Sequence, residues 1–302
     1  MRQTLLSQIF AKETNDDSQE NVEFYDLFCG LGGASTGAAQ AGMRVVYAAD
    51  ADQQALEVHA LNHPDCRHEC VRFPATVPLP TDGRKFHLHG SPPCNELSSA
   101  SYSTTTLHRE RERATALVEW FVDLASTRSP RSWSFEQVAS EEVIDVLTRA
   151  RRRDRNVDFD VFRFELLGVP QIRRRVIAGP PHIVDRLRMH RSEANVRAAR
   201  SVMPCLPPEA VYIRHGKSPN QRPAASCVRS LSTPAFAVLT RNPMRIVDAR
   251  FKTLRHMTVA EKLALQTFPT DYALGSLYKK DKHRLVGNAV PPLVIRLMLC
   301  PP

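Results

Sequence analysis

Short apolar runs alternate with amphipathic or small-residue stretches over most of the N-terminal half of the chain. Residues 21–28 (NVEFYDLF) predict a strand, the following CGLGGASTG predicts a turn, and residues 34–42 predict a small-residue helix that ends at Gly42. Residues 43–50 (MRVVYAAD) predict a second strand, and a helix is expected over 51–63. This order of strand, turn, helix, strand and helix is typical of a doubly wound α/β sheet.

The same alternation continues to about residue 181. FHLHG (86–90) predicts a strand that runs into SPPC, and the pattern then predicts a helix over 115–126 and a strand over 132–138. Ser140 is a predicted cap for a helix over 141–153, which has glutamates in its first turn and arginines in its last. Two further strands are expected, over 157–167 and 173–181.

The pattern weakens from about 182 to 230, where the chain is rich in proline and basic residues. This composition favours a small irregular subdomain over a second packed sheet. A helix is predicted again over 258–268, where Thr258 and Glu261 have the spacing of a capping box. The tail is expected to turn at GNAVPP (287–292) and to end in an apolar helix.

The charge of the chain points to a polyanionic partner. Lys and Arg number 41 against 32 Asp and Glu, a formal charge of +9, and the excess lies mainly at 149–155, 171–175 and 186–252. A hydrophobic content of 42% excludes a disordered chain, and no apolar run approaches the roughly 18 residues of a membrane span. We therefore expect an intracellular protein of cytoplasm or nucleus, without signal peptide, transmembrane segment or membrane partner.

The cysteines and histidines give no sign of a metal site. The seven cysteines show neither C-x-x-C spacing nor a Cys/His cluster, which favours reduced thiols over disulfides or zinc. His87 and His89 alternate on one predicted strand without a third candidate ligand nearby, so they are interpreted as strand-face side chains.

The glycine-rich turn predicts a nucleotide cofactor. Gly30, Gly32, Gly33 and Gly37 lie between a strand and a helix, where the backbone can approach a ligand closely. Asp50 follows at the end of the next strand, where a carboxylate can hold ribose hydroxyls. These residues indicate an adenosine-type cofactor without deciding which; a nicotinamide stays open, as does a turn that only packs helix on strand.

Two further residues are candidates for catalysis. Pro92 and Pro93 stiffen the chain after the 86–90 strand and present Cys94 at the rim of the expected cleft, although most single cysteines are small buried side chains. Glu136 lies in an apolar strand, where a carboxyl group must be protonated or hydrogen-bonded if it is buried. The alternative is an edge carboxylate that faces water.

The chain resembles the cytosine-C5 methyltransferases that use S-adenosylmethionine, most of which act on DNA. Seven motifs occur in the order of that family, from Phe24 to Arg296 with the exception of 182–230. They are FYDLFCGLGG, YAADADQQALEVHALNHP, GSPPCNELS, FEQV, GVPQIRRR, LRHMTVAEKLALQTFP and LVGNAVPP. The resemblance implies a Rossmann-like methyltransferase fold with a mixed, mostly parallel sheet and a small target-recognition subdomain.

The resemblance also implies a role for each matched position. Cys94 would attack C6 of a flipped-out cytosine and Glu136 would bind and protonate N3, with Arg173 and Arg175 completing the catalytic set. DNA contacts would come from Ser98, Gln171, Arg173 and Arg175, with Ser98 in a loop (95–106) that closes over the base. The expected cofactor contacts are Phe28, Gly30, Leu31, Gly32, Gly33, Asp50, Pro93, Asn288 and Val290.

The implied division of the chain is a polar tail at 1–21, a catalytic and cofactor-binding domain at 22–181, a target-recognition subdomain at 182–250 and a returning segment at 251–302. Duplex DNA with a short recognition sequence is the expected substrate, no metal is expected, and the protein is expected to act as a monomer. A cognate restriction endonuclease is a further expected partner if the enzyme belongs to a restriction system.

The chain departs from the family pattern at several positions. Gln137 replaces the usual Asn beneath the nucleophile, Cys70 replaces the acid of the pair that holds the adenine, and Ala51 replaces an aromatic residue. Asn95 stands where the family has Gln after the cysteine. None of these positions makes or breaks bonds, so activity is expected, with weaker or differently shaped cofactor binding.

Three other functions stay open at this point. A tRNA-methylating member of the same family is suggested by S-P-P-C and by the short recognition segment, although that branch's Cys-Phe-Thr signature is absent. Gln137 and Cys70 leave room for a catalytically silent nucleic-acid-binding relative. A nicotinamide oxidoreductase would leave PPC and QIRRR unexplained.

Overall fold

A seven-stranded sheet forms the centre of the molecule. The computed structural model describes residues 22–93, 106–203, 206, 210–213, 227–240 and 244–300. Five neighbouring strands of the sheet run parallel, and the last two are antiparallel to their neighbours. In sheet order the strands are β3 (Arg67–Cys70), β2 (Arg44–Asp50), β1 (Glu23–Leu27), β4 (Phe86–Gly90), β5 (Ser132–Gln137), β8 (Arg174–Gly179) and β6 (Asp158–Arg163). The predicted α/β class is confirmed.

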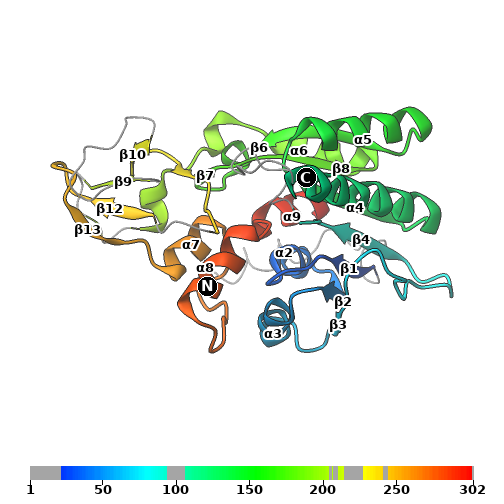
Figure 1. Cartoon of the computed structure of the whole chain (residues 1–302). Coiled ribbons are helices and arrows are strands. Elements are labelled where there is room, and N and C mark those ends of the chain that lie inside the picture. Colours follow the sequence, from blue (N-terminus) through cyan, green and yellow to red (C-terminus); the bar gives the residue numbers. More distant parts are fainter. Residues whose placement is uncertain are drawn as a thin grey trace, which may run out of the picture.

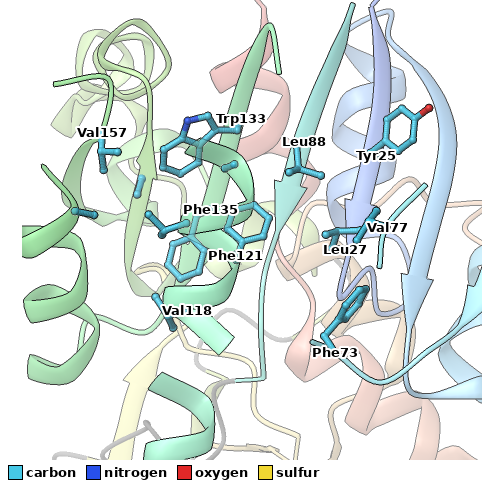
Figure 2. Close-up of a cluster of buried hydrophobic side chains, with 14 of the residues drawn as sticks. Tyr25, Leu27, Phe73, Val77, Leu88, Val118, Phe121, Trp133, Phe135 and Val157 are labelled. Carbon is cyan, nitrogen blue, oxygen red and sulfur yellow. The ribbon is translucent and has the colours of Figure 1, made fainter. Parts of the chain in front are cut away.

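Helices cover both faces of this sheet (Figure 1). One face packs on α4 (Thr106–Arg128) and α5 (Glu141–Arg153), whose apolar side chains meet alternate strand residues in the core of Figure 2. Tyr25, Leu27 and Leu88 point to this face. The opposite face packs on α2 (Gly33–Gln40), α6 (Pro181–His190) and α9 (Pro292–Leu299). Because both faces are covered, every residue of β1 and β4 is buried.

His87 and His89 on β4 lie inside this second face, fully buried. Both His87 nitrogens lie within 2.8 Å of a serine hydroxyl on β5, and His89 Nδ1 lies 2.7 Å from Ser134 Oγ. Burial lowers the pKa of His89 to about 3, so the ring is neutral. The interpretation of both histidines as strand-face side chains is confirmed.

A second, smaller sheet follows in the region where the sequence showed no clear period. Its strands pair in antiparallel fashion, whereas irregular chain was expected in this region. In sheet order the strands are β10 (Val228–Ser230), β9 (Val211–Ile213), β12 (Arg245–Val247) and β13 (Thr253–His256). Strands of three or four residues are too short to show an alternating pattern. In Figure 1 this sheet lies at the opposite end of the molecule from α4 and α5.

Two helices lie between the small sheet and α2 (Figure 1). They are α7 (Val259–Leu265), which begins with the predicted Thr258–Glu261 capping box, and α8 (Lys279–Asn288), which the sequence did not predict. A two-stranded parallel pair, β7 (Gln171–Ile172) and β11 (Ala235–Phe236), also links the two regions. Short 3-10 helices complete the fold at Phe164–Leu167, Glu193–Asn195 and Ala199–Val202.

Helix α6 lies beyond residue 181, where the first domain was expected to end. It packs against β8, β6 and α9, so the packing of the large sheet continues to His190. The helix begins at Pro181, and this proline is its one start signal because no capping side chain precedes it. Among the described helices, none is both long and apolar enough to cross a membrane.

Candidate active site

A cavity lined by described residues lies at the carboxyl ends of β1 and β4. The strand order β3-β2-β1-β4-β5 reverses direction between these two strands, which is where doubly wound sheets bind ligands. The cavity measures about 570 Å³, a volume ordinary for a small-molecule site. The turn after β1 forms one wall, and Ser91, Pro92 and Pro93 after β4 form another.

The turn after β1 adopts the conformation that its glycines permit. Gly30 has a φ of +53° and its missing side chain would point into open space, so the backbone lines the cavity at this position. Gly33 is required for packing instead, because a Cβ at that position would lie 2.1 Å from the Val290 carbonyl oxygen. The turn is therefore held directly against the C-terminal segment.

Asp50 joins this turn to β2. One carboxylate oxygen accepts a hydrogen bond from the Gly30 backbone N–H at 2.9 Å, and the other accepts from the Asp52 N–H, also at 2.9 Å. Burial raises the pKa of Asp50, and the two backbone hydrogen bonds oppose that shift. The carboxylate lines the cavity, as a ribose-binding acid must.

Not every predicted cofactor residue reaches the cavity. Phe28, Gly30, Gly33, Asp50, Pro93, Asn288 and Val290 line it. Leu31 does not, because its side chain is buried with Ala55, Val58 and residues of α7 and α8. Gly32 faces Tyr272 and His59, so it also lies away from the cavity. These two positions serve the packing of the turn.

Gln137 holds the segment that leads to Cys94. Its amide donates to the Pro92 carbonyl at 2.9 Å and to the Pro93 carbonyl at 3.4 Å, and its oxygen accepts from the Val138 N–H. Pro92 is buried, so its carbonyl oxygen needs a hydrogen-bond donor from the protein. The amide at this position therefore supports the proline turn although it is Gln.

Glu136 lies in the same cavity as Pro93 and is 5% exposed. The Arg175 Nε lies 3.1 Å from a carboxylate oxygen of Glu136, an ion pair that is not aligned as a hydrogen bond. β4 and β5 are parallel neighbours, with Gly90 opposite Phe135, so their carboxyl ends meet at one edge of the sheet. The carboxyl group of Glu136, near the end of β5, and the residues that follow β4 therefore face the same space.

The remaining residues of the Q-x-R-x-R pattern have buried positions. Gln171 is fully buried, and its amide group bonds the Leu265 carbonyl, the Gln266 side chain and the Val238 N–H. The prediction that it contacts DNA is wrong for this structure, because its polar atoms are satisfied inside the protein. It ties β7 to α7 and to the segment after β11.

Arg173 is 2% exposed and donates to the carbonyls of Gly287 and Ala289, at 3.5 and 3.1 Å. It lines the cavity together with Glu136. The predicted contact of Arg173 with DNA stays a prediction. Arg175 of this pattern lies next to the candidate catalytic acid.

Several lining residues carried no sequence signal. Phe73 packs on Phe28 with ring centroids 4.6 Å apart, and Arg113 and Leu117 come from α4. Arg284 on α8 pairs with Asp52 and donates to Gln54 at 3.1 Å. These side chains come from loops and helices far apart in sequence, and only the tertiary fold brings them to one cavity.

Two of the predicted site residues, Cys94 and Ser98, lie outside the part of the chain that the structure describes, and their roles stay predictions. Besides Gln137, two further positions that depart from the family pattern, Ala51 and Cys70, lie within it. Ala51 lines the cavity, whereas the exposed Cys70 reaches only the Ala51 carbonyl, at 3.9 Å. The cavity wall beside Asp50 therefore lacks the aromatic side chain that the family pattern has after the acid.

Comparison with known proteins identifies the family of the chain. The family model for C-5 cytosine-specific DNA methylase matches residues 22–179 and 190–299, and the chain belongs to this family. Type II methyltransferase M.HgiDI of Herpetosiphon aurantiacus is 25% identical over 284 residues, covering 88% of this chain and 89% of that protein. Type II methyltransferase M1.HphI of Haemophilus parahaemolyticus is 24% identical, covering 91% and 84%.

Solved structures share the fold. The S. pombe Dnmt2 methyltransferase has a TM-score of 0.65 at 16% identity and covers 91% of this chain and 96% of its own. A mutant of Spodoptera frugiperda DNMT2 has a TM-score of 0.62 at 16% identity, with 91% and 97% covered. The Rossmann-like methyltransferase architecture is thus confirmed.

Proposed function

We propose that the chain is a DNA cytosine-C5 methyltransferase that acts through a covalent adduct between Cys94 and C6 of a flipped-out cytosine. One observation carries the proposal. Pro93, the residue before Cys94, lines a single cavity together with Glu136, Gly30 and Asp50. A nucleophile, an acid and a nucleotide-binding turn would then share one site, which is what methyl transfer to a base requires.

The cavity suits S-adenosylmethionine, the cofactor of this family. That cofactor, when bound, supplies an electrophilic methyl group on a sulfonium. Gly30 leaves the wall open for close approach, Asp50 offers a carboxylate to ribose hydroxyls, and Phe28 offers an aromatic ring. Pro93, Asn288 and Val290 would complete the contacts.

The chain's own groups supply the rest of the reaction. Cytosine C5 is a weak nucleophile, and addition of the Cys94 thiolate to C6 converts the ring to an enamine at C5. Glu136 holds N3 by a proton or strong hydrogen bond, which neutralises the charge that develops there, while Arg175 keeps the carboxyl group in place. Once C5 carries the methyl group, transfer of the C5 proton to a water molecule restores the C5–C6 double bond and expels Cys94 as the thiolate.

Duplex DNA is the proposed substrate, and type II methyltransferases among the relatives support this choice. A base in a duplex must leave the stack before its C6 can be attacked, at a cost of a few kcal/mol. We propose that the loop 95–106 closes over the flipped base and that the subdomain at 182–250 contacts about two to four base pairs. We further propose that the enzyme acts as a monomer.

Methyl transfer from labelled S-adenosylmethionine to duplex DNA and to tRNA, run side by side, tests the proposal. We expect label on DNA only, a loss of at least about 10³-fold in Cys94→Ser, and a large loss in Glu136→Gln. Cys300→Ser, which changes a thiol at the end of α9, is the control and should keep wild-type activity. Label on tRNA alone would instead assign an RNA substrate, and DNA binding without transfer would indicate a silent relative.

A further inference from the structure

A cluster of histidine and cysteine side chains lies outside the cavity, between α3 (Gln53–Asn62) and the edge strand β3. The potential ligand atoms of His59, Cys66 and His68 all lie within 4.8 Å of one another. His59 is fully buried, Cys66 is 7% exposed, and His68 is partly buried. None of the three lines the candidate active site, and the proposed reaction uses none of them.

The fold places these three residues together. His59 lies on the buried face of α3, which packs on β2 and β3. Cys66 lies just before β3 and His68 is the second residue of that strand, and the potential ligand atoms of both lie close to those of His59 on the helix. The spacing matches no common zinc motif, which is why the sequence did not predict a cluster at these positions.

Ser35 fixes the orientation of the His59 ring. His59 Nε2 lies 2.9 Å from Ser35 Oγ, and the Ser35 hydroxyl donates to the buried Asp26 carboxylate at 2.7 Å. Because that hydroxyl proton is directed to Asp26, His59 Nε2 must carry the proton and donate to Ser35. The Nδ1 lone pair then points to the other side of the ring, where His68 Nε2 lies 2.8 Å away.

This arrangement is the one found around metal-binding histidines. A histidine ligand usually donates its second ring N–H to an oxygen acceptor, which fixes the ring and the tautomer. His63 is not part of the donor set, because its Nε2 lies 3.3 Å from Thr36 Oγ1. The cluster thus offers two imidazole nitrogens and one thiol sulfur, and the hydrogen bonds from His59 to Ser35 and from Ser35 to Asp26 already orient the His59 ring.

We propose that His59 Nδ1, Cys66 Sγ and His68 Nε2 bind one structural Zn²⁺ ion, with water in the fourth position. Two nitrogen and one sulfur donors suit zinc better than magnesium or calcium, which prefer oxygen ligands. Binding releases the thiol proton of Cys66 to solvent and moves the His68 proton from Nε2 to Nδ1, so no oxidant is needed.

The site needs one small adjustment before it binds the ion. Tetrahedral ligands at Zn–N distances of about 2.05 Å are roughly 3.3 Å apart, so His68 must move away from His59 by about 0.5 Å. β3 is an edge strand, paired only with β2 among the described strands, and His68 is partly exposed. The ion would connect α3 to β3, whose Cys70 is paired with Asp50, and Asp50 holds the cofactor turn.

Zinc titration of the purified full chain, after treatment with EDTA, tests the proposal. The assay is competition with a chromogenic chelator, with Mg²⁺ as the comparison ion. We expect one Zn²⁺ per chain at submicromolar Kd, no Mg²⁺ binding at the cluster, and a rise in Tm with Zn²⁺. Cys66→Ser and His68→Gln should each weaken zinc binding at least about 100-fold, and Ser35→Ala should weaken it about 10- to 100-fold.

Cys70→Ser is the matched control, because it removes an exposed thiol from the same strand outside the cluster. It should leave the zinc stoichiometry and Kd unchanged. If a cluster variant does not fold, the absorption spectrum of the Co²⁺-loaded wild type decides, since a cysteine-ligated tetrahedral site gives a thiolate charge-transfer band. The proposal would be overturned if the wild type bound no stoichiometric zinc or if the Co²⁺-loaded protein gave no thiolate band. It would also be overturned if Cys66→Ser and Cys70→Ser bound zinc equally well.

Discussion

Removal of the Gln137 amide should disturb the active site through the two prolines before Cys94. In Gln137→Ala the buried Pro92 carbonyl loses a 2.9 Å hydrogen bond, the Pro93 carbonyl loses a weaker one at 3.4 Å, and the Val138 N–H loses its acceptor. One buried polar group left without a partner costs about 1–3 kcal/mol. We expect a loss of unfolding free energy of about 2 kcal/mol in chemical denaturation.

The effect on catalysis should be larger than the effect on binding. Gln137 is not among the residues that line the cavity, so the KM values should change little. A misplacement of the nucleophile by about 1 Å can cost about 100-fold in rate, and we expect kcat to fall by about 10- to 100-fold. Steady-state methyl transfer to duplex DNA measures both constants.

Two further substitutions at this position separate geometry from packing. Gln137→Glu keeps the shape but turns an oxygen toward the Pro92 carbonyl, so it should lose at least as much kcat as Gln137→Ala. Gln137→Asn keeps the donor with a shorter reach and should recover part of the rate. Wild-type kcat in a folded Gln137→Glu variant would refute the reasoning.

Three more predictions concern the scaffold. Gly33→Ala should lower the unfolding free energy by about 1–3 kcal/mol in urea denaturation, because the new Cβ would lie 2.1 Å from the Val290 carbonyl oxygen. Unchanged stability would contradict this close packing. Gln171→Leu should lower the unfolding free energy by at least about 2 kcal/mol in the same assay, and the folded variant should keep its affinity for DNA. A loss of DNA affinity without a loss of stability would show that Gln171 contacts DNA. Burial lowers the pKa of Lys262 from 10.5 to about 8, so the unfolded chain binds more protons than the native chain between these values. Stability relative to Lys262→Met should therefore rise between pH 8 and 10.5, by up to about 3 kcal/mol, and a constant difference across that range would exclude the effect.

The sequence predicted the large sheet because local signals and tertiary packing agree there. Six of its seven strands are short, mainly apolar runs that the sequence predicted, whereas β3 (RHEC) has no apolar run and was not predicted. Ser140 and Thr258 cap their helices as expected. The small sheet and α6 were not predicted, because strands of three or four residues show no period and Pro181 begins its helix without a capping side chain.

The sequence predicted those site residues that have a reactive or ligand-binding side chain, or a proline turn, at the end of a predicted strand. Asp50, Pro93 and Glu136 each follow or end a strand of a parallel sheet, and the carboxyl ends of such strands share one edge. The burial of Gln171 and the part played by Arg284 could not be predicted, because both depend on contacts between segments about 90 to 230 residues apart. A single sequence contains no distance signal for such pairs.

Trapping of a covalent complex tests the central claim most directly. A duplex with 5-fluorocytosine at the target position should stop the reaction after methyl transfer, since fluorine cannot leave as a cation in place of the C5 proton. With the recognition sequence first identified by bisulfite sequencing, mass spectrometry of the digested complex should locate the DNA adduct on Cys94, and Cys94→Ser should form none. Methylation of normal duplex without a trapped adduct, or an adduct on another cysteine such as the cavity-lining Cys29, would contradict the account.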